Sequence, residues 1–415
     1  MDADVVIEKG GEYPTYGADN GRKLIEYMNV PYDDQLWDEL LDQLTWDETV
    51  DLLSNGRHKT QAIQSVSKPA TGDENGPNGY NTRYSEASGG SKYSGPTNPY
   101  ADRIDDPDLG AGYSTTGFSS NGILAATFNK ELSYDIGKQI GEEGFWAGMA
   151  GWLGTGLNIQ RSPYAGRTSE YYSEDAMLSG LIAAPEVEAM QSMGMNCFIK
   201  HCALNESETA RHGACEWISE QALRENYLRA FEIAIVDGGS YSVMTAFNRM
   251  GVIAVANCVE FSQGWLRQEV GLPGIIETDC AGDMTDGAHG EAYVSRICNV
   301  YTGATDLNEY NYATDAPDYT GGTHTYADFA PDENGEGDYG NLGQAMREAA
   351  HRILWTTVRT AAMSGMSSNT DIVRIAPPWK IGIIAADIAL GVLLACSVAW
   401  MAVDQAIAFK KKQSV

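Results

Sequence analysis

Apolar residues recur at two different spacings along this 415-residue chain, and the two spacings alternate. Apolar positions three and four residues apart predict helices at 36–53, 132–149, 183–193, 219–236 and 261–270. Short apolar runs predict buried segments at 153–159 and 197–199 and strands at 241–247 and 274–278. Such alternation is typical of a parallel α/β sheet, and the number of units predicts an α/β fold of the (β/α)8 TIM-like barrel type.

The C-terminal end of the chain has another pattern. Residues 381–403 read IGIIAADIALGVLLACSVAWMAV, with Asp387 as the one charge. Trp379 and Trp400 lie near the ends of this run, and a Lys410–Lys412 cluster follows it. At about 1.5 Å per residue such a helix is long enough to cross a bilayer. We predict a single transmembrane helix at 379–403 and a short basic tail at 404–415. The lysines favour a cytoplasmic C-terminus, with the part of the chain before the helix outside the cell. A buried core helix is the alternative.

The rest of the chain divides into two predicted parts. Residues 31–366 are expected to form the barrel, and residues 1–30 resemble the end of a linker. The first 21 residues are acidic and Gly-rich and lack the apolar core of a signal peptide. Gly-rich stretches at 89–120 and 315–341 are predicted surface loops.

Charge and cysteine content narrow the possible functions. The formal net charge of -29 argues against a nucleic-acid partner, because phosphate binding needs clustered Lys and Arg. The seven cysteines form no CxxC pair, so the sequence indicates neither a zinc site nor a disulfide framework.

Four polar clusters follow predicted strands and are candidates for chemistry, because the carboxyl ends of barrel strands converge on one face. Each taken alone also fits a turn or a helix cap. They are Asp73 with the turn at 75–79, the segment 161–175, Lys200-His201 with the residues downstream, and Thr278-Asp279.

The order of these clusters resembles glycoside hydrolase family 3, the family of β-glucosidases and β-xylosidases. The similar segments extend from about Leu40 to Met363. They are GLNIQRSPYAGRTSEYYSEDAMLSG, IKHCALNESETAR, EQALRENYLRAFEIAI, VMTAFNRMG and LRQEVGLPGIIETDC.

This resemblance implies an exo-acting, retaining hydrolase that releases terminal β-linked sugars from an oligosaccharide or β-glycoside, without cofactor or metal. Asp279 falls at the position of the nucleophile. The residues expected to bind sugar hydroxyls are Asn75, Arg167, Lys200, His201 and Phe247, with Asp73 as a possible substitute if its loop shifts. Glu208 and Arg211 are expected to hold the Lys200-His201 pair in place.

Several positions depart from the family pattern. Asn75 stands where the family has the Asp of a DGP turn, Phe247 replaces a Tyr, and Cys280 replaces an aromatic residue. In most β-glucosidases of the family a sandwich domain supplies the acid/base Glu. The chain resembles the barrel portion of members with reversed domain order, so we expect that Glu on a separate or missing domain.

Two alternatives remain open. The β-N-acetylhexosaminidase branch of the family uses a loop His as acid/base, and His212 lies at a suitable spacing from Lys200-His201, although CALNESETARHG does not match that branch's loop. The other alternative is a membrane-anchored, glycan-binding or degenerate barrel without turnover, which the substitutions at 75, 247 and 280 favour.

Overall fold

The computed structural model divides the chain into two compact units, residues 1–372 and residues 373–415, and each is described here by itself. The described residues are 7–54, 56, 59–80, 115–211, 214–279, 296–307, 325–373 and 378–413. Of the predicted loop at 89–120 only residues 115–120 are described, and of the predicted loop at 315–341 residues 325–341 are described.

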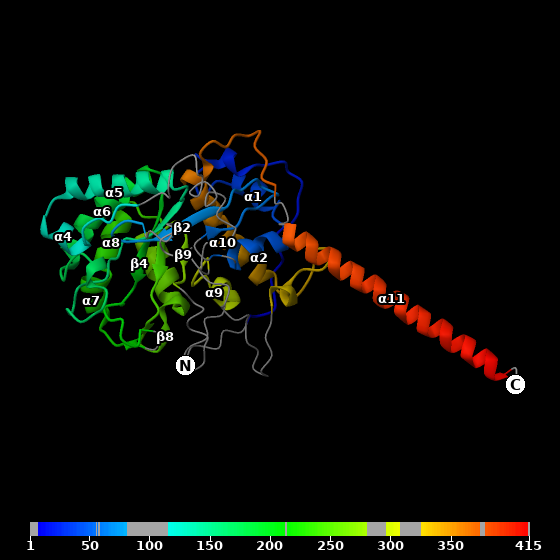
Figure 1. Cartoon of the computed structure of the whole chain (residues 1–415). Coiled ribbons are helices and arrows are strands. Elements are labelled where there is room, and N and C mark those ends of the chain that lie inside the picture. Colours follow the sequence, from blue (N-terminus) through cyan, green and yellow to red (C-terminus); the bar gives the residue numbers. More distant parts are fainter. Residues whose placement is uncertain are drawn as a thin grey trace. The chain divides into compact units, whose positions relative to one another are not determined.

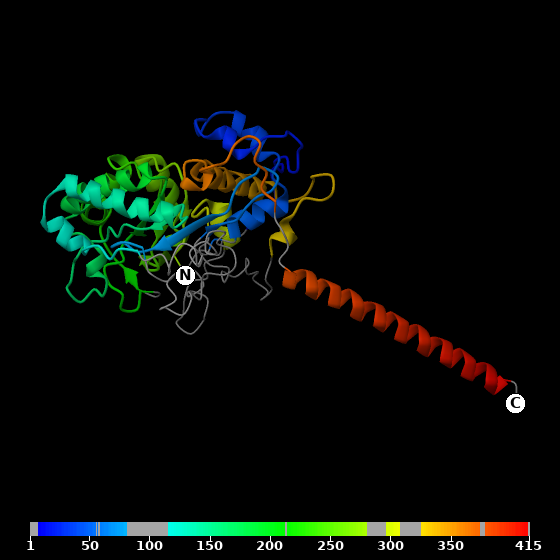
Figure 2. The same ribbon diagram turned by 45° about the horizontal axis from the view of Figure 1, so that its top comes forward.

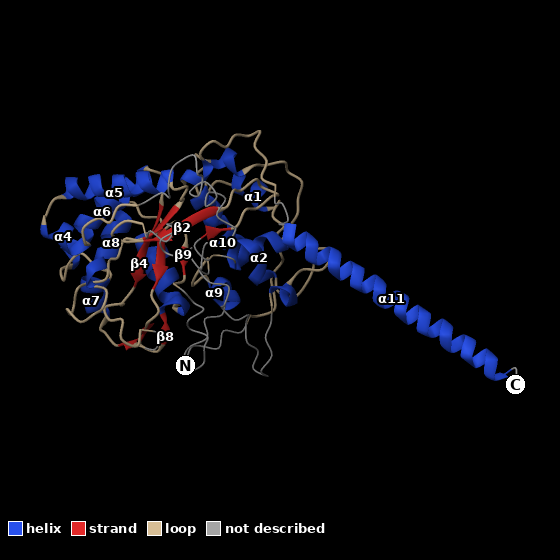
Figure 3. Ribbon diagram, in the orientation of Figure 1, coloured by secondary structure: helices blue, strands red, loops and turns tan. Residues whose placement is uncertain are grey.

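A six-stranded sheet forms the centre of the first unit, in the order β1-β2-β3-β4-β6-β9 (Figure 3). Its strands are β1 (Lys59–Thr60), β2 (Thr71–Asn75), β3 (Gly151–Leu153), β4 (Asn196–Cys202), β6 (Ser242–Thr245) and β9 (Ile276–Glu277). The β1–β2 pair is antiparallel and all the other pairs are parallel. Neighbours follow the order of the chain, as in a singly wound sheet. This confirms the α/β class, while closure into an eight-stranded barrel stays a prediction.

The two faces of this sheet pack into two hydrophobic cores. Consecutive strand residues point to opposite faces, so Cys197 and Ile199 of β4 lie in one core and Phe198 lies in the other. Figures 1 and 2 place α5, α6 and α8 on one side of the strands and α1, α2 and α10 on the other. The face that includes Phe198 continues to Lys200, two residues further along β4.

The helices of the first unit cover both faces. The regular helices are α1 (Leu36–Leu41), α2 (Trp46–Ser54), α4 (Asn121–Ala126), α5 (Lys130–Trp146), α6 (Ala176–Ser192), α7 (Glu220–Ala222), α8 (Arg229–Val236), α9 (Arg296–Thr302) and α10 (Gly340–Thr357). The 3₁₀ and π segments are η1 (Leu24–Tyr27), η5 (Thr168–Glu170), η6 (Leu223–Tyr227), η7 (Val255–Asn257), η8 (Glu260–Val270), η10 (Tyr326–Phe329) and η11 (Ala361–Met363). A small second sheet joins β5 (Cys215–Glu216), β7 (Arg249–Met250) and β8 (Ile253–Ala254).

The prediction of a single helix at 36–53 was wrong, because the structure has two helices there, α1 and α2. Thr45 interrupts the run. Its hydroxyl accepts a hydrogen bond from the Glu48 backbone N–H at 3.1 Å, and the Glu48 carboxylate accepts one from the Thr45 N–H at 3.1 Å. This reciprocal pair is a capping box, which starts a new helix. The Thr-x-x-Glu spacing was visible in the sequence.

The N-terminal residues pack onto the first unit. Leu24 and Tyr27 are fully buried, and the Gly10 N–H donates to the Asp338 carbonyl at 2.6 Å. In the structure these residues therefore contribute to the core that α10 also lines. The linker-like interpretation of 1–30 and the boundary at 366 stay predictions.

The second unit contains the helix α11 (Pro378–Gln413). By length and composition its 26-residue stretch Gly382–Ile407 could cross a membrane, and none of its most apolar window is buried within the chain.

A carboxyl group inside the first unit makes its stability depend on pH. Glu186 of α6 is 1% exposed, and its Oε2 accepts a hydrogen bond from the Tyr172 hydroxyl. Burial raises the pKa of Glu186 to about 8, with the Tyr172 hydrogen bond opposing that shift. Because the pKa is higher in the folded protein than the ordinary value of 4.5, the folded state binds the proton more tightly than the unfolded state does. The stability that this proton contributes is complete below pH 4.5 and is lost as pH rises to about 8.

We therefore expect Glu186→Gln to gain stability relative to the parent protein as pH rises from 5 to 8.5, by a total on the order of a few kcal/mol. Denaturant unfolding in mild detergent at each pH gives the difference in free energy of unfolding. Glu188→Gln, an exposed position on the same helix, is the matched control and should show no such trend. A pH-independent difference for Glu186→Gln would contradict the expectation.

Candidate functional site

Three strands bring predicted site residues together at their carboxyl ends. Asn75 ends β2, Lys200 and His201 lie near the end of β4, and Asp279 follows β9 by two residues. The Lys200 Nζ donates to Asn75 Oδ1 at 3.0 Å, and the His201 Nε2 lies 3.6 Å from Asp279 Oδ2. The convergence expected for parallel strands is therefore present.

The turn after Asn75 needs glycine. Gly76 has a φ of +139°, a conformation that side chains rarely adopt, and a Cβ there would overlap the Gly79 carbonyl. The Trp152 Nε1 donates to the Gly76 carbonyl at 2.8 Å and fixes this turn against β3. The amide side chain of Asn75 is thereby held beside β4.

Arg167 is the central cation of the site. It follows Gly166, whose φ of +95° turns the chain, and it immediately precedes η5. The guanidinium donates to Glu170 through Nε (2.8 Å) and Nη2 (2.5 Å), and its Nη1 lies 2.9 Å from His201 Nε2. Forked bonding of this kind fixes both the position and the plane of a guanidinium.

These contacts determine the charge states. Burial lowers the pKa of His201 well below its usual range, and the charges of Arg167 and Lys200 lower it further. His201 is therefore neutral near pH 7. Because an arginine N–H can only donate, His201 Nε2 accepts from Arg167, and the ring proton is on Nδ1. That Nδ1 has no hydrogen-bond partner among the residues that the structure describes.

Glu208 and Arg211, which the sequence reasoning expected to hold the Lys200-His201 pair, lie beside Arg167, and Glu208 is the residue that contacts it. Glu208 Oε1 is 3.7 Å from Arg167 Nη1, and its Oε2 accepts from Arg211 Nη1 at 2.8 Å. The Arg211 guanidinium lies over the Phe247 ring, 4.5 Å from the centroid. The buried Phe247 thus borders the cluster through a cation–π contact.

Several further residues support this cluster. The sequence reasoning included Asn205 among the polar residues downstream of Lys200-His201, but it missed Asn158. Asn158 accepts from the His201 N–H at 2.8 Å and donates to the His201 carbonyl at 3.0 Å, so it fixes both backbone groups of His201. Asn205 donates to Glu208 Oε1 at 2.9 Å and to the Tyr171 hydroxyl at 3.2 Å. Glu170 was detectable, since it follows Arg167 by three residues, a spacing at which opposite charges often pair.

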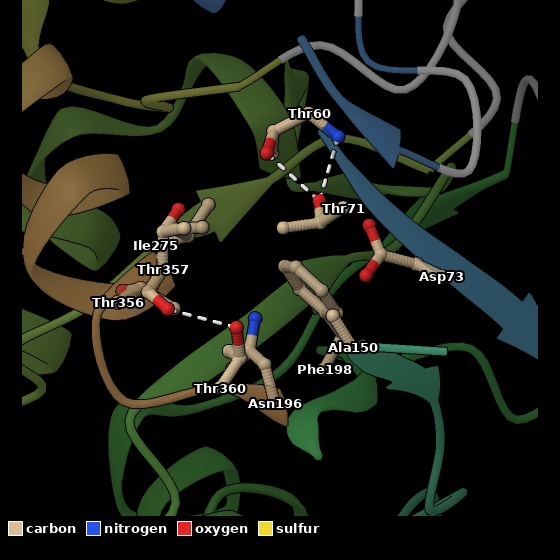
Figure 4. A pocket seen from close by; sticks show the side chains of 10 residues that line it. All are labelled: Thr60, Thr71, Asp73, Ala150, Asn196, Phe198, Ile275, Thr356, Thr357 and Thr360. Carbon is tan, nitrogen blue, oxygen red and sulfur yellow. Dashed lines mark hydrogen bonds between the residues drawn. The ribbon is translucent and has the colours of Figure 1, made fainter. Parts of the chain in front are cut away.

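Asp73 lies elsewhere. Figure 4 shows its carboxylate facing an internal cavity, with the side chains of Thr60, Thr71, Asn196 and Phe198 around it. Neither Arg167, Lys200, His201 nor Asp279 lines that cavity. Burial raises the pKa of Asp73 to about 7, opposed by nearby Lys68. The structure therefore does not bring Asp73 together with the other predicted sugar-binding residues, because it is two residues before Asn75 on β2.

Some predicted features cannot be placed. Residues 212 and 280, which include His212 of the hexosaminidase alternative and the substituted Cys280, lie outside the described residues. Within the described ranges, no group of three or more His, Cys, Asp or Glu side chains is arranged to hold a metal ion.

Comparison with known proteins agrees with this fold. Residues 108–296 match the glycosyl hydrolase family 3 N terminal domain. A "Beta-glucosidase" of Ruminococcus albus is 38% identical over 164 residues, which are 40% of this chain and 17% of that protein. An "Exo-alpha-(1->6)-L-arabinopyranosidase" of Bifidobacterium longum is 32% identical over 246 residues, which are 59% of this chain and 30% of that protein.

Among solved structures, β-glucosidase 3B from Thermotoga neapolitana in complex with glycerol superposes with a TM-score of 0.61 at 27% sequence identity. The match covers 80% of this chain and 44% of that one. In sequence and in fold the chain is thus similar to β-glucosidases, and its residues 108–296 carry the match to the glycosyl hydrolase family 3 N terminal domain. It spans less than a third of the length of the two relatives named above.

Proposed function

We propose that this chain carries the nucleophile and much of the sugar-binding site of an exo-acting, retaining glycoside hydrolase that acts on terminal β-linked sugars. The observation that carries the proposal is the position of Asp279, with its Oδ2 3.6 Å from a neutral His201 that Arg167 holds in place. Arg167 and Lys200 supply positive charge around that carboxylate. A carboxylate flanked by fixed donors suits attack on an anomeric carbon.

The chemistry proceeds in two displacements. The Asp279 carboxylate forms a bond to the anomeric carbon while the bond to the leaving oxygen breaks, and that oxygen takes a proton from an acid. A water molecule then attacks the same carbon, gives up a proton and releases Asp279, so the product keeps its configuration. Lys200, Arg167 and Asn75 are proposed to bind ring hydroxyls. His201, neutral and with its proton on Nδ1, accepts from Arg167 through Nε2 and so holds that guanidinium in place.

The acid is proposed to come from a separate domain. Two described carboxyl groups near the cluster, those of Glu170 and Glu206, are poorly suited to the task. Burial disfavours the charge of Glu170, but the hydrogen bonds from Arg167 outweigh it and lower the pKa of Glu170. Glu206 has a pKa raised by burial to about 7, yet it is 2% exposed and accepts hydrogen bonds from Asn158 and the Ile159 N–H. An acid must reach the leaving oxygen.

A dinitrophenyl β-glucoside tests this function, because its leaving group departs without a proton. The full chain in detergent should release dinitrophenolate in a burst of about one equivalent, since deglycosylation without the base is slow. NMR of the first-formed sugar should show the β anomer. Binding of glucose without any burst supports the non-catalytic, glycan-binding alternative, and a first-formed α anomer contradicts a retaining mechanism.

We also propose that α11 spans a membrane once, with the first unit outside and the C-terminus in the cytoplasm. Its apolar length and the lysines at 410–412 support this. Expressed in cells, the chain should stay with membranes after an alkaline carbonate wash, and added protease should reach the first unit. Release by the wash, or protection of the first unit in intact cells, would count against it.

A further inference from the structure

The segment that leads to Asp279 has little regular structure of its own. Strand β9 contains two residues and pairs with β6 on one side. On the other side Glu277 forms a parallel bridge to Leu307. A strand this short is not held by its ladder alone, so other contacts must fix its position.

Asp306 provides those contacts. Its Oδ2 accepts from the Ile276 N–H at 2.8 Å, and its own N–H donates to the Ile276 carbonyl at 2.8 Å. One residue therefore binds both main-chain groups of Ile276. Beside it, the Thr278 N–H donates to the Leu307 carbonyl at 3.0 Å. Asp306 and Leu307 together border the chain from Ile276 to the residue before Asp279.

Two arginines from different helices hold the Asp306 carboxylate. Arg267 of η8 donates to Oδ2 at 2.5 Å, and Arg352 of α10 donates to Oδ1 at 2.8 Å. Arg267 Nη1 also donates to the carbonyls of Leu272 and Gly274 at 2.6 Å each, just before β9. Asp306 is 1% exposed, so this charged group is desolvated and depends on its partners.

We propose that Asp306 is a positioning residue for Asp279: clamped by Arg267 and Arg352, it fixes β9 and so aligns the nucleophile without touching the sugar. Only Glu277 and Thr278 separate Ile276 from Asp279, so a displacement of β9 is passed on to the carboxylate. A misplacement of about 1 Å can reduce a rate about 100-fold. This inference rests on the proposed role of Asp279.

The test compares Asp306→Asn with the parent chain in the rate at which a 2-deoxy-2-fluoroglucosyl reagent labels the full-length protein. The variant keeps the shape and one acceptor but removes the charge. We expect the first-order labelling rate at saturating reagent to fall about tenfold or more, while the half-saturating concentration changes less than about twofold. Both are measured well below the unfolding midpoint of each protein.

Glu348→Gln is the matched control. Glu348 binds Arg352 Nη2 at 2.7 Å, is about half exposed, and belongs to the same network without contacting β9 in the described structure. Its labelling rate should stay near that of the parent. An unchanged rate in Asp306→Asn, an equal loss in both variants, or a change only in half-saturation overturns the proposal.

Arg352→Gln decides the question if Asp306→Asn does not fold. It removes one of the two clamps and leaves the bond to Ile276, so a several-fold slower labelling rate is expected and an unchanged rate overturns the proposal. If the parent chain itself is not labelled, the proposed hydrolase function fails first, and the positioning role fails with it.

Discussion

Replacement of Asp279 by Asn is expected to abolish hydrolysis of a dinitrophenyl β-glucoside, with a loss on the order of 10⁴-fold or more, as when other enzymes lose a nucleophile. Asn has nearly the same shape, so its contact with His201 can persist, but a neutral amide cannot form the glycosyl ester. Stopped-flow detection of dinitrophenolate gives both the burst and the steady state. The burst should disappear.

A chemical rescue separates loss of the nucleophile from loss of the fold. In Asp279→Gly, azide or formate can occupy the vacated space and attack the sugar, and the azide product then has the inverted configuration. Asp237→Asn, an exposed position at the end of α8, is the matched control and should keep full activity. A burst that survives in Asp279→Asn would mean that another group attacks the sugar.

The second large effect is expected for Arg167→Met. The change removes the two hydrogen bonds to Glu170 and the contact with His201. It also leaves the Glu170 carboxylate, whose side chain is 23% exposed, without the cation that it paired with. We expect kcat/KM to fall by about 10²- to 10³-fold and the free energy of unfolding to fall by roughly 3 kcal/mol. Steady-state kinetics and urea unfolding measure the two effects.

Two comparisons give this result its meaning. Arg167→Lys keeps the charge but cannot make the forked contact, so it should recover stability better than kcat/KM. Arg229→Met breaks a half-exposed pair with Glu232 on α8 and should change the free energy of unfolding by less than about 0.5 kcal/mol. If Arg167→Met keeps normal kcat/KM, Arg167 has only a structural role.

Much of the fold followed from local patterns. Helix and strand order was predictable because buried β3, β4, β6 and β9 leave short apolar runs between amphipathic helices. The division of 36–53 into two helices was missed, because apolar periodicity outweighed the capping box at Thr45. The small β5-β7-β8 sheet was missed too, since two-residue strands leave no periodicity to detect.

The sequence predicted which residues lie at the strand ends, but it did not predict the hydrogen bonds that link distant segments around them. Ordered motifs placed Asn75, Lys200, His201 and Asp279 at strand ends, and the structure brings these four residues together. The clamp of Asp306 on Ile276 depends on three separate segments, which no local pattern links. The sequence did not show which residue of β2 reaches the site. Asp73 and Asn75 are two residues apart and share a face of the strand, but Asp73 lies deeper in the sheet and lines the internal cavity.

Covalent trapping tests the central claim most directly. The full chain is incubated with 2,4-dinitrophenyl 2-deoxy-2-fluoro-β-glucoside, and peptide mass spectrometry locates any added sugar. The account predicts one fluoroglucosyl group per chain, attached to Asp279 and absent from Asp279→Asn. A sugar attached to another residue, or no covalent sugar on a folded chain that binds glucose, contradicts it.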